Sequence, residues 1–176
     1  NNINTRFITR WNLAEAGSGA TQLNFVVSSY GEVKYSWESV PAGTSGSGTF
    51  TGSNSYTVIS GLPAGATIDL KIDPTNFNKI VLKDQIDKNR LIDIKHWGTT
   101  HWLSMSDAFE GCENLNISAT DVPDLSGVGS MLRMFKNCTS LNSPLNIGTW
   151  NVENVSHMGN MFEGALAFNQ PIGSWN

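Results

Sequence analysis

The first half of the chain alternates hydrophobic and polar residues in short segments. Because successive side chains of a β-strand point to opposite faces, each segment presents one apolar face to a core. The clearest segments run over residues 22–27, 33–38 and 67–72, and turn sequences such as residues 41–43 separate them. The pattern predicts an antiparallel, immunoglobulin-like β-sandwich over residues 1–82.

The second half repeats itself every 26 or 27 residues, a period typical of stacked repeats. The repeated columns are Met105, Met131 and Met158; Phe109, Phe135 and Phe162; Leu115, Leu141 and Phe168; Cys112 and Cys138; and Trp97, Pro123 and Trp150. Within a repeat the apolar residues fall at i, i+3, i+4 and i+7, which predicts a short amphipathic helix.

For residues 83–176 we therefore expect a leucine-rich-repeat-like solenoid of short helices and strands, with its last copy truncated. The expected fold class of the whole chain is mixed α and β. Its N-terminal sandwich would be followed directly by the repeats.

Two segments of the repeat have a familiar order of residues. Residues 134–142 (MFKNCTSLN) and 148–158 (GTWNVENVSHM) resemble repeats of bacterial surface proteins related to BspA-like leucine-rich repeats. The resemblance covers about residues 91–176, and residues 1–82 more weakly resemble PKD-like or immunoglobulin-like modules. It implies a secreted or surface-displayed bacterial protein with a role in adhesion, and it brings no catalytic residue set.

Composition narrows the classes of partner. The chain has 176 residues, of which 39% are hydrophobic, enough for one ordinary core or two small ones. Its 11 basic and 15 acidic residues give a net charge of −4, and no basic cluster follows a path suited to a phosphate backbone. No apolar run reaches the roughly 18 residues that span a membrane. We expect no nucleic-acid partner and no transmembrane span.

Candidate chemistry is sparse. Cys112 and Cys138 are expected to be small buried apolar residues, although a bridge between them stays open. His96 and His101 lack a metal-binding motif around them, since zinc normally takes three or four protein ligands. The sequence therefore predicts no metal, no cofactor and no catalytic residues, and the protein is not expected to be an enzyme.

Trp102 lies outside the repeated columns, so we expect it to be exposed. Together with His101 it forms a weak candidate for a ligand-binding patch, because exposed aromatic side chains stack on sugars or anchor protein partners.

The leading functional hypothesis is non-catalytic adhesion or ligand binding through the repeats, outside the cell or on a bacterial cell surface. The expected partner is a host or neighbouring-cell protein or a glycan. Self-association through the open C-terminal repeat is a further option. The alternatives are a structural stalk or spacer, which needs no exposed aromatic patch, and a carbohydrate-binding accessory module, which needs two coplanar exposed aromatics.

Overall fold

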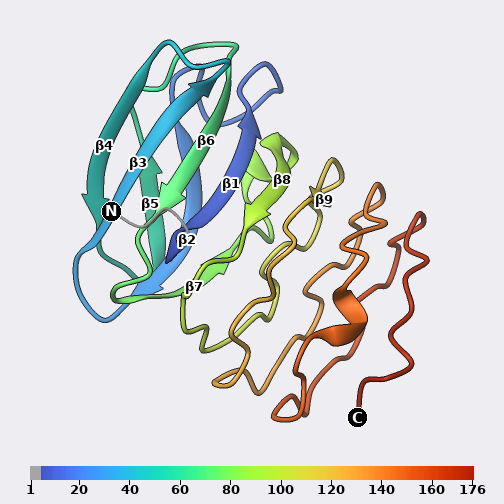
Figure 1. Ribbon diagram of the computed structural model, residues 1–176. Helices are drawn as coiled ribbons and strands as arrows, with labels where there is room; N and C mark the ends of the chain where they lie inside the picture. The colour runs from blue at the N-terminus through green and yellow to red at the C-terminus, as the bar shows by residue number, and fades with distance from the viewer. Residues whose placement is uncertain (1–4) are drawn as a thin grey trace.

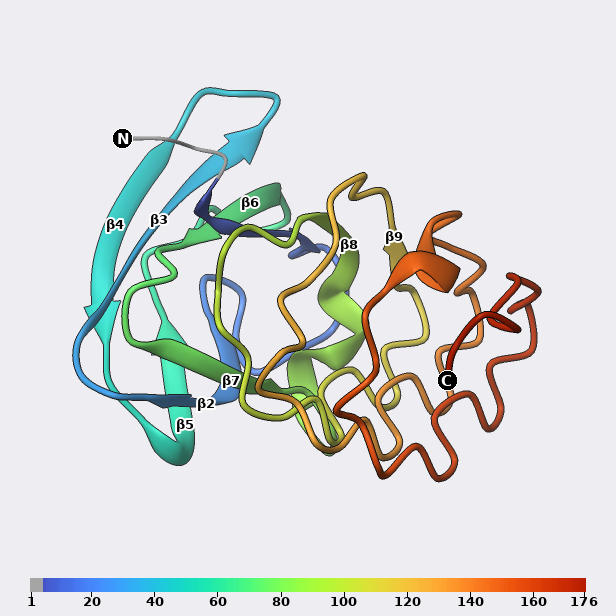
Figure 2. The ribbon, with the colours of Figure 1, turned by 60° about the horizontal axis from the view of Figure 1, so that its bottom comes forward.

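The structure is a computed structural model and describes residues 5–176. Most of its regular structure lies in two β-sheets that face each other in the N-terminal half (Figures 1 and 2). One sheet has the strand order β4-β3-β6-β1-β8-β9 and the other has the order β5-β2-β7. The strands are β1 (Phe7–Asn12), β2 (Leu23–Ser29), β3 (Val33–Val40), β4 (Ser45–Phe50), β5 (Ser53–Ile59), β6 (Thr67–Ile72), β7 (Phe77–Val81), β8 (Leu91–His96) and β9 (Asn116–Ile117).

Alternation of buried and exposed residues builds the N-terminal half. Strands β2, β3 and β6 lie where the alternation in the sequence is clearest, and β1, β2 and β6 alternate buried with half-buried residues. Their buried side chains meet between the two sheets. The rings of Trp11 on β1 and Phe25 on β2 stack there with centroids 5.6 Å apart. This contact joins one sheet to the other through the core.

The predicted mixed α and β fold, with its leucine-rich-repeat-like solenoid of helices and strands, is wrong. The fold is nearly all β, and no α-helix forms among residues 5–176. The helical elements are short 3₁₀ turns, such as η2 (Ile86–Arg90) and η3 (Ile147–Thr149). Each segment expected to be an amphipathic helix is instead a run of turns.

Each of these segments consists of two successive four-residue turns. In the second repeat, Met134 N–H donates to the carbonyl oxygen of Met131 at 3.1 Å, and Cys138 N–H donates to that of Phe135 at 3.1 Å. The third residue of each turn is left-handed, as in a type II turn. These residues are Asp107, Gly111, Arg133, Asn137, Asn160 and Gly164.

The turn pair explains why the helix prediction failed. Two adjoining four-residue turns place their first and fourth residues on the core side, which gives apolar positions i, i+3, i+4 and i+7. An α-helix gives the same spacing through its 3.6-residue period. The apolar pattern alone therefore does not distinguish the two backbones.

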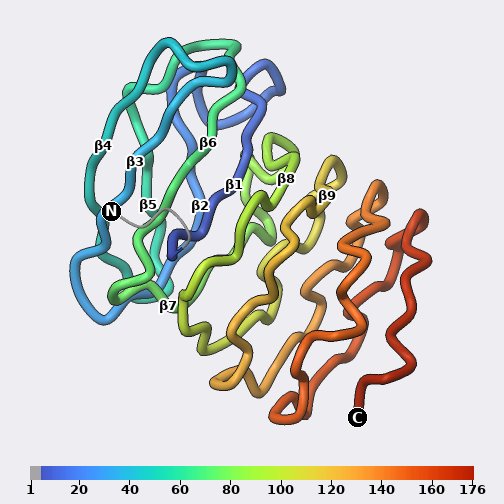
Figure 3. The backbone as a smooth tube through the Cα atoms, viewed as in Figure 1, coloured from blue at the N-terminus to red at the C-terminus, as the bar shows by residue number. Residues whose placement is uncertain are grey.

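Beyond β8 the chain forms repeat units that lie side by side (Figures 1 and 3). We define repeat unit 1 as residues 104–129, repeat unit 2 as residues 130–156 and repeat unit 3 as residues 157–176. Alternate backbone N–H groups of one unit donate to carbonyl oxygens of the next. The donor–acceptor pairs are Met105–Ser130, Asp107–Leu132, Phe109–Met134, Gly111–Lys136, Met131–His157, Arg133–Gly159, Phe135–Met161 and Asn137–Glu163, at 2.7–3.0 Å.

Side chains reinforce this backbone pairing. Phe109, Phe135 and Phe162 form a stack with centroids 5.8 Å apart at each step and nearly parallel rings. Along another edge, the Asn142 N–H donates to Asn116 Oδ1, and the Asn169 N–H donates to Asn142 Oδ1. Amide side chains thus satisfy backbone groups of the following unit.

Strand β8 joins the repeat units to the sandwich. It pairs antiparallel with β1 and parallel with β9, so the larger sheet contains strands from both sides of residue 82. The boundary between residues 82 and 83 stays a prediction. The buried side chains of both halves form a single hydrophobic cluster.

Truncating the middle ring of the phenylalanine stack tests its contribution to stability. Phe135 is fully buried between Phe109 and Phe162. We expect Phe135→Ala to lower the free energy of unfolding by about 3–5 kcal/mol, because a large buried aromatic leaves a cavity. Chemical denaturation measures this change.

The matched control is Phe162→Ala, which truncates the half-buried end of the same stack. Its loss should be clearly smaller, because less of that ring is removed from water in the folded state. Equal losses in the free energy of unfolding for the two variants would contradict the full burial of Phe135.

Candidate functional site

Trp102 is not a surface residue, so the predicted exposure is wrong. Its side chain is 0% exposed and meets Phe7 and Phe77 edge to face, with centroids 5.0 and 5.3 Å away. Both partners belong to the sandwich rather than to the repeats. Trp102 falls outside the repeated columns because it packs at the junction between the two halves.

His101, by contrast, is exposed, with 55% of its side chain accessible. Its Nδ1 lies 3.0 Å from Asp124 Oδ2, which ties the segment before repeat unit 1 to a loop within that unit. The structure therefore does not bring His101 and Trp102 to one surface, and the expected patch does not form.

Ser126 completes a Ser–His–Asp group, but its geometry does not suit nucleophilic catalysis. The Ser126 hydroxyl donates to Asp124 Oδ1 at 2.6 Å, and this bond is the main cause of the lowered pKa of Asp124. In a catalytic triad the serine and the carboxylate face different ring nitrogens of the histidine. Here Ser126 and Asp124 both face Nδ1 of His101, so the serine is not activated.

A charged cluster joins repeat units 1 and 2. Arg133 Nε lies 2.7 Å from Asp107 Oδ1 and 3.6 Å from Glu110 Oε2, and Lys83 Nζ lies 3.9 Å from Glu110 Oε2. Burial raises the pKa of Glu110. Burial opposes ionisation of Asp107 as well, but the bond from Arg133 and the nearby positive charges outweigh it and lower the pKa. The cluster connects neighbouring units as an ion-pair network.

The repeat columns lie inside the protein. Met105, Met131, Phe109, Phe135, Cys112, Cys138, Leu115, Leu141, Trp97 and Trp150 are buried, and Met158, Phe162 and Phe168 are partly buried against the same core. Trp97 and Trp150 meet edge to face with centroids 5.5 Å apart. The buried residues of these columns hold the fold together and present no binding surface.

Sequence analysis missed an apolar groove on the repeat units. It lies between residues 117–120 and residues 143–146 and has a volume of about 370 Å³, within the range of small-ligand sites. Leu145 lines the groove and is 83% exposed. An exposed leucine beside an apolar groove is the kind of surface that recognition sites use. The only sequence signal was a leucine within a turn segment, directly after Pro144.

The polar groups of the groove are almost all engaged within the protein. The Ser143 hydroxyl accepts from the Ile117 N–H and donates to Asn116, and the Asn146 side chain donates to the carbonyl oxygen of Thr120. Asn146 Oδ1 is different, because it is buried and has no hydrogen-bond partner. Because this oxygen is buried, it is not exposed to a ligand, and the groove offers an apolar surface for contact.

Metal-binding groups do not converge in the described part of the chain. Residues 5–176 contain no group of three or more His, Cys, Asp or Glu side chains placed to hold a metal ion. His96 is engaged by the carbonyl oxygen of Arg6 at 3.0 Å and by Asp121 at 3.3 Å. The same residues include no helix long and apolar enough to cross a membrane.

Cys112 and Cys138 are both buried and unbridged. The Cys138 thiol donates to the carbonyl oxygen of Phe109 at 3.0 Å. Burial raises the pKa of Cys138 to about 12 and raises the pKa of Cys112 well above its usual value. Both are therefore poor nucleophiles in the folded protein.

Fold and site define a β protein in which a two-sheet sandwich is continued by side-by-side repeat units with an apolar groove. The chain belongs to the family described as Mycoplasma protein of unknown function, DUF285, whose model matches residues 75–176. No curated protein and no solved structure matches the chain. The resemblance to BspA-like leucine-rich repeats was wrong, because the family that matches the repeats is DUF285.

The raised thiol pKa values predict slow modification of both cysteines in the native state. At pH 8 a thiol with a pKa of about 12 is ionised in only about one molecule in ten thousand, and only the thiolate reacts. We expect a disulfide reagent to label Cys112 and Cys138 rapidly in denaturant and very slowly without it. Rapid labelling of the folded protein would show that these side chains are accessible.

Proposed function

We propose that this protein is a non-catalytic binding protein that acts in adhesion or ligand capture, outside the cell or on a bacterial cell surface. Its partner would be a protein or glycan of a host or neighbouring cell. Binding would need no cofactor. The groove at Leu145 is the proposed contact surface, in place of Trp102 and His101.

The exposed Leu145 side chain is the observation that carries this proposal. A leucine that is 83% exposed is available to a partner, and the groove beside it offers an apolar wall. Burying one leucine against a partner contributes about 1.5–3 kcal/mol. A partner with an exposed apolar side chain would match this surface.

A catalytic role has less support from the arrangement of titratable groups. Asp107 and Glu110, whose pKa values are shifted in opposite directions, form ion pairs with Arg133 and Lys83 and do not line the groove. His101 is bonded to Asp124 on an exposed edge. General acid–base catalysis needs such groups within reach of a bound substrate.

Self-association through repeat unit 3 is a further option, and backbone donors without an acceptor support it. In the described part of the chain, the backbone N–H groups of Met158, Asn160, Phe162 and Gly164 have no hydrogen-bond partner. They continue the positions that donate forward in units 1 and 2. The Phe162 and Phe168 rings lie beside them, 4.1 Å apart and only partly buried. A second chain that offers carbonyl groups here would satisfy these donors.

The groove is tested by displaying the intact protein multivalently against a glycan array and a panel of host surface and matrix proteins. We expect reproducible binding that Leu145→Ser abolishes, because the substitution removes the exposed apolar contact. A surface change of this kind should alter the free energy of unfolding by no more than about 0.5 kcal/mol.

The matched control is Leu166→Ser, since Leu166 is 85% exposed and does not line the groove. It should bind like the unmodified protein. Loss of binding in both variants would point to general hydrophobic adhesion. No binding by the folded, multivalent protein would favour the structural spacer instead.

A further inference from the structure

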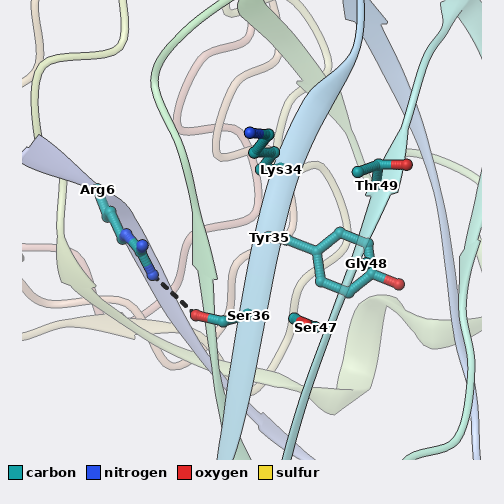
Figure 4. A pocket seen from close by; sticks show the side chains of 7 residues that line it. All are labelled: Arg6, Lys34, Tyr35, Ser36, Ser47, Gly48 and Thr49. Atoms are coloured by element: carbon teal, nitrogen blue, oxygen red, sulfur yellow. Dashed lines mark hydrogen bonds between the residues drawn. The ribbon is translucent and has the colours of Figure 1, made fainter. Parts of the chain in front are cut away.

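A pocket opens on the larger sheet, away from the groove at Leu145. Its lining comes from Arg6, which precedes β1, and from β3 and β4 (Figure 4). We call it the Arg6–Lys34 pocket; its other lining residues are Tyr35, Ser36, Ser47, Gly48 and Thr49. Its volume of about 330 Å³ is at the lower end of the range for small-ligand sites.

Strand register places the polar side chains of this pocket together. Lys34 lies opposite Thr49, and Ser36 lies opposite Ser47. Because alternate residues of a strand point to the same face, Lys34 and Ser36 share the face that is turned away from the buried Val33 and Trp37. One cation and three hydroxyl groups therefore gather over two neighbouring strands.

Arg6 supplies the second positive charge. Its Nη1 donates to Ser36 Oγ at 2.8 Å, as Figure 4 shows. Among residues 5–176, no carboxylate lies within ion-pair distance of Arg6 or Lys34. The remaining N–H groups of the guanidinium are thus free to donate to a ligand.

The acidic side chains on the same sheet have partners of their own. Glu38 lies 2.6 Å from Lys71, and Asp69 lies 2.8 Å from Arg10. Asp73 is the nearby countercharge. Burial opposes its ionisation, but hydrogen bonds from Thr75 and the charges of Arg6 and Lys34 together lower its pKa. Arg6 and Lys34 still exceed Asp73 by one positive charge.

Hydroxyl groups in the pocket have free bonding capacity. Ser36 Oγ accepts from Arg6, so its own proton can be donated to a ligand. Ser47 and Thr49 make no side-chain hydrogen bond within residues 5–176. The pocket therefore combines charge for an oxyanion with neutral groups for hydroxyls.

We propose that the Arg6–Lys34 pocket binds an acidic saccharide, with its sulfate or carboxylate group between Arg6 and Lys34 and its hydroxyls on Ser36, Ser47 and Thr49. A saccharide carries the oxyanion and the hydroxyl groups on one small ring. An acidic peptide offers the carboxylate but few hydroxyls. This site is separate from the groove at Leu145, so either proposal can fail without the other.

The net negative charge of the protein means that binding of an anionic probe points to a local positive site. The protein carries a formal charge of −4, so a polyanion is repelled overall and binds only where positive charge is concentrated. The probes are a sulfated heparin-derived tetrasaccharide, a uronate disaccharide, inorganic sulfate and a glutamate-rich hexapeptide. Calorimetry gives the affinity at low and high salt, and amide NMR shifts report the site.

We expect both saccharides to bind more tightly than inorganic sulfate, with shifts at Ser36, Ser47 and Thr49 and weaker binding in high salt. Lys34→Gln and Arg6→Gln should each weaken saccharide binding about tenfold. Both substitutions leave a side chain that can donate hydrogen bonds. Lys34 is exposed, so Lys34→Gln should fold normally, as the amide spectrum will show.

The matched control is Lys79→Gln, which removes one positive charge from β7 on the other sheet. It should leave saccharide affinity unchanged. Four results would each overturn the proposal. They are a Lys79→Gln variant that weakens saccharide binding as much as Lys34→Gln does, tighter binding of the hexapeptide than of the saccharides, amide NMR shifts elsewhere on the protein, and no saccharide binding at all. Binding of inorganic sulfate as tight as that of the saccharides would also overturn it, because the hydroxyl contacts would then contribute nothing.

Discussion

The backbone hydrogen bonds that the turn pairs, residues 105–112 and 131–138, make to the next repeat unit are all donated in the same direction, from an earlier N–H to a later carbonyl oxygen. This constraint requires alternate peptide groups to point along the stack, while the peptides between them close turns. The left-handed residues in each unit, such as Arg133 and Asn137, make that alternation feasible. The same spacing brings Phe109, Phe135 and Phe162 into a parallel stack. Backbone pairing and ring packing therefore support each other.

The two halves meet at the side of repeat unit 1 that faces the sandwich. Strand β8, which pairs with β1, and the ring contacts of Trp102 with Phe7 and Phe77 form this junction. Trp97 completes this junction by contacting Phe7 on one side and Trp150 on the other. The hydrophobic interior consequently runs without interruption from the sheets into the repeats. A change at this junction would affect both halves together.

The sequence contained enough information to locate strands and repeat columns, because alternation and period follow directly from which side chains face the core. It did not distinguish turn pairs from helices, since both place Met131, Met134, Phe135 and Cys138 on one side. Trp102 was misjudged for a different reason. Its partner Phe7 lies some 95 positions away in the chain, and no periodic pattern reveals such a contact. The groove at Leu145 depends on how neighbouring units adjoin, which a single repeat does not show.

Ligand recognition depends on groups that the fold itself leaves without partners. Within the repeats, the side chains of Asn116 and Asn142 bond to the following unit, Ser143 and Asn146 bond to the preceding one, and what remains in the groove is an apolar wall. On the larger sheet, ion pairs occupy the other charges and leave Arg6 and Lys34 over a row of hydroxyls. The two surfaces therefore differ in chemistry, one apolar and one cationic. A ligand that bound both the groove and the Arg6–Lys34 pocket would need an apolar group and an oxyanion. A partner with only one of these groups would bind only one of the two surfaces.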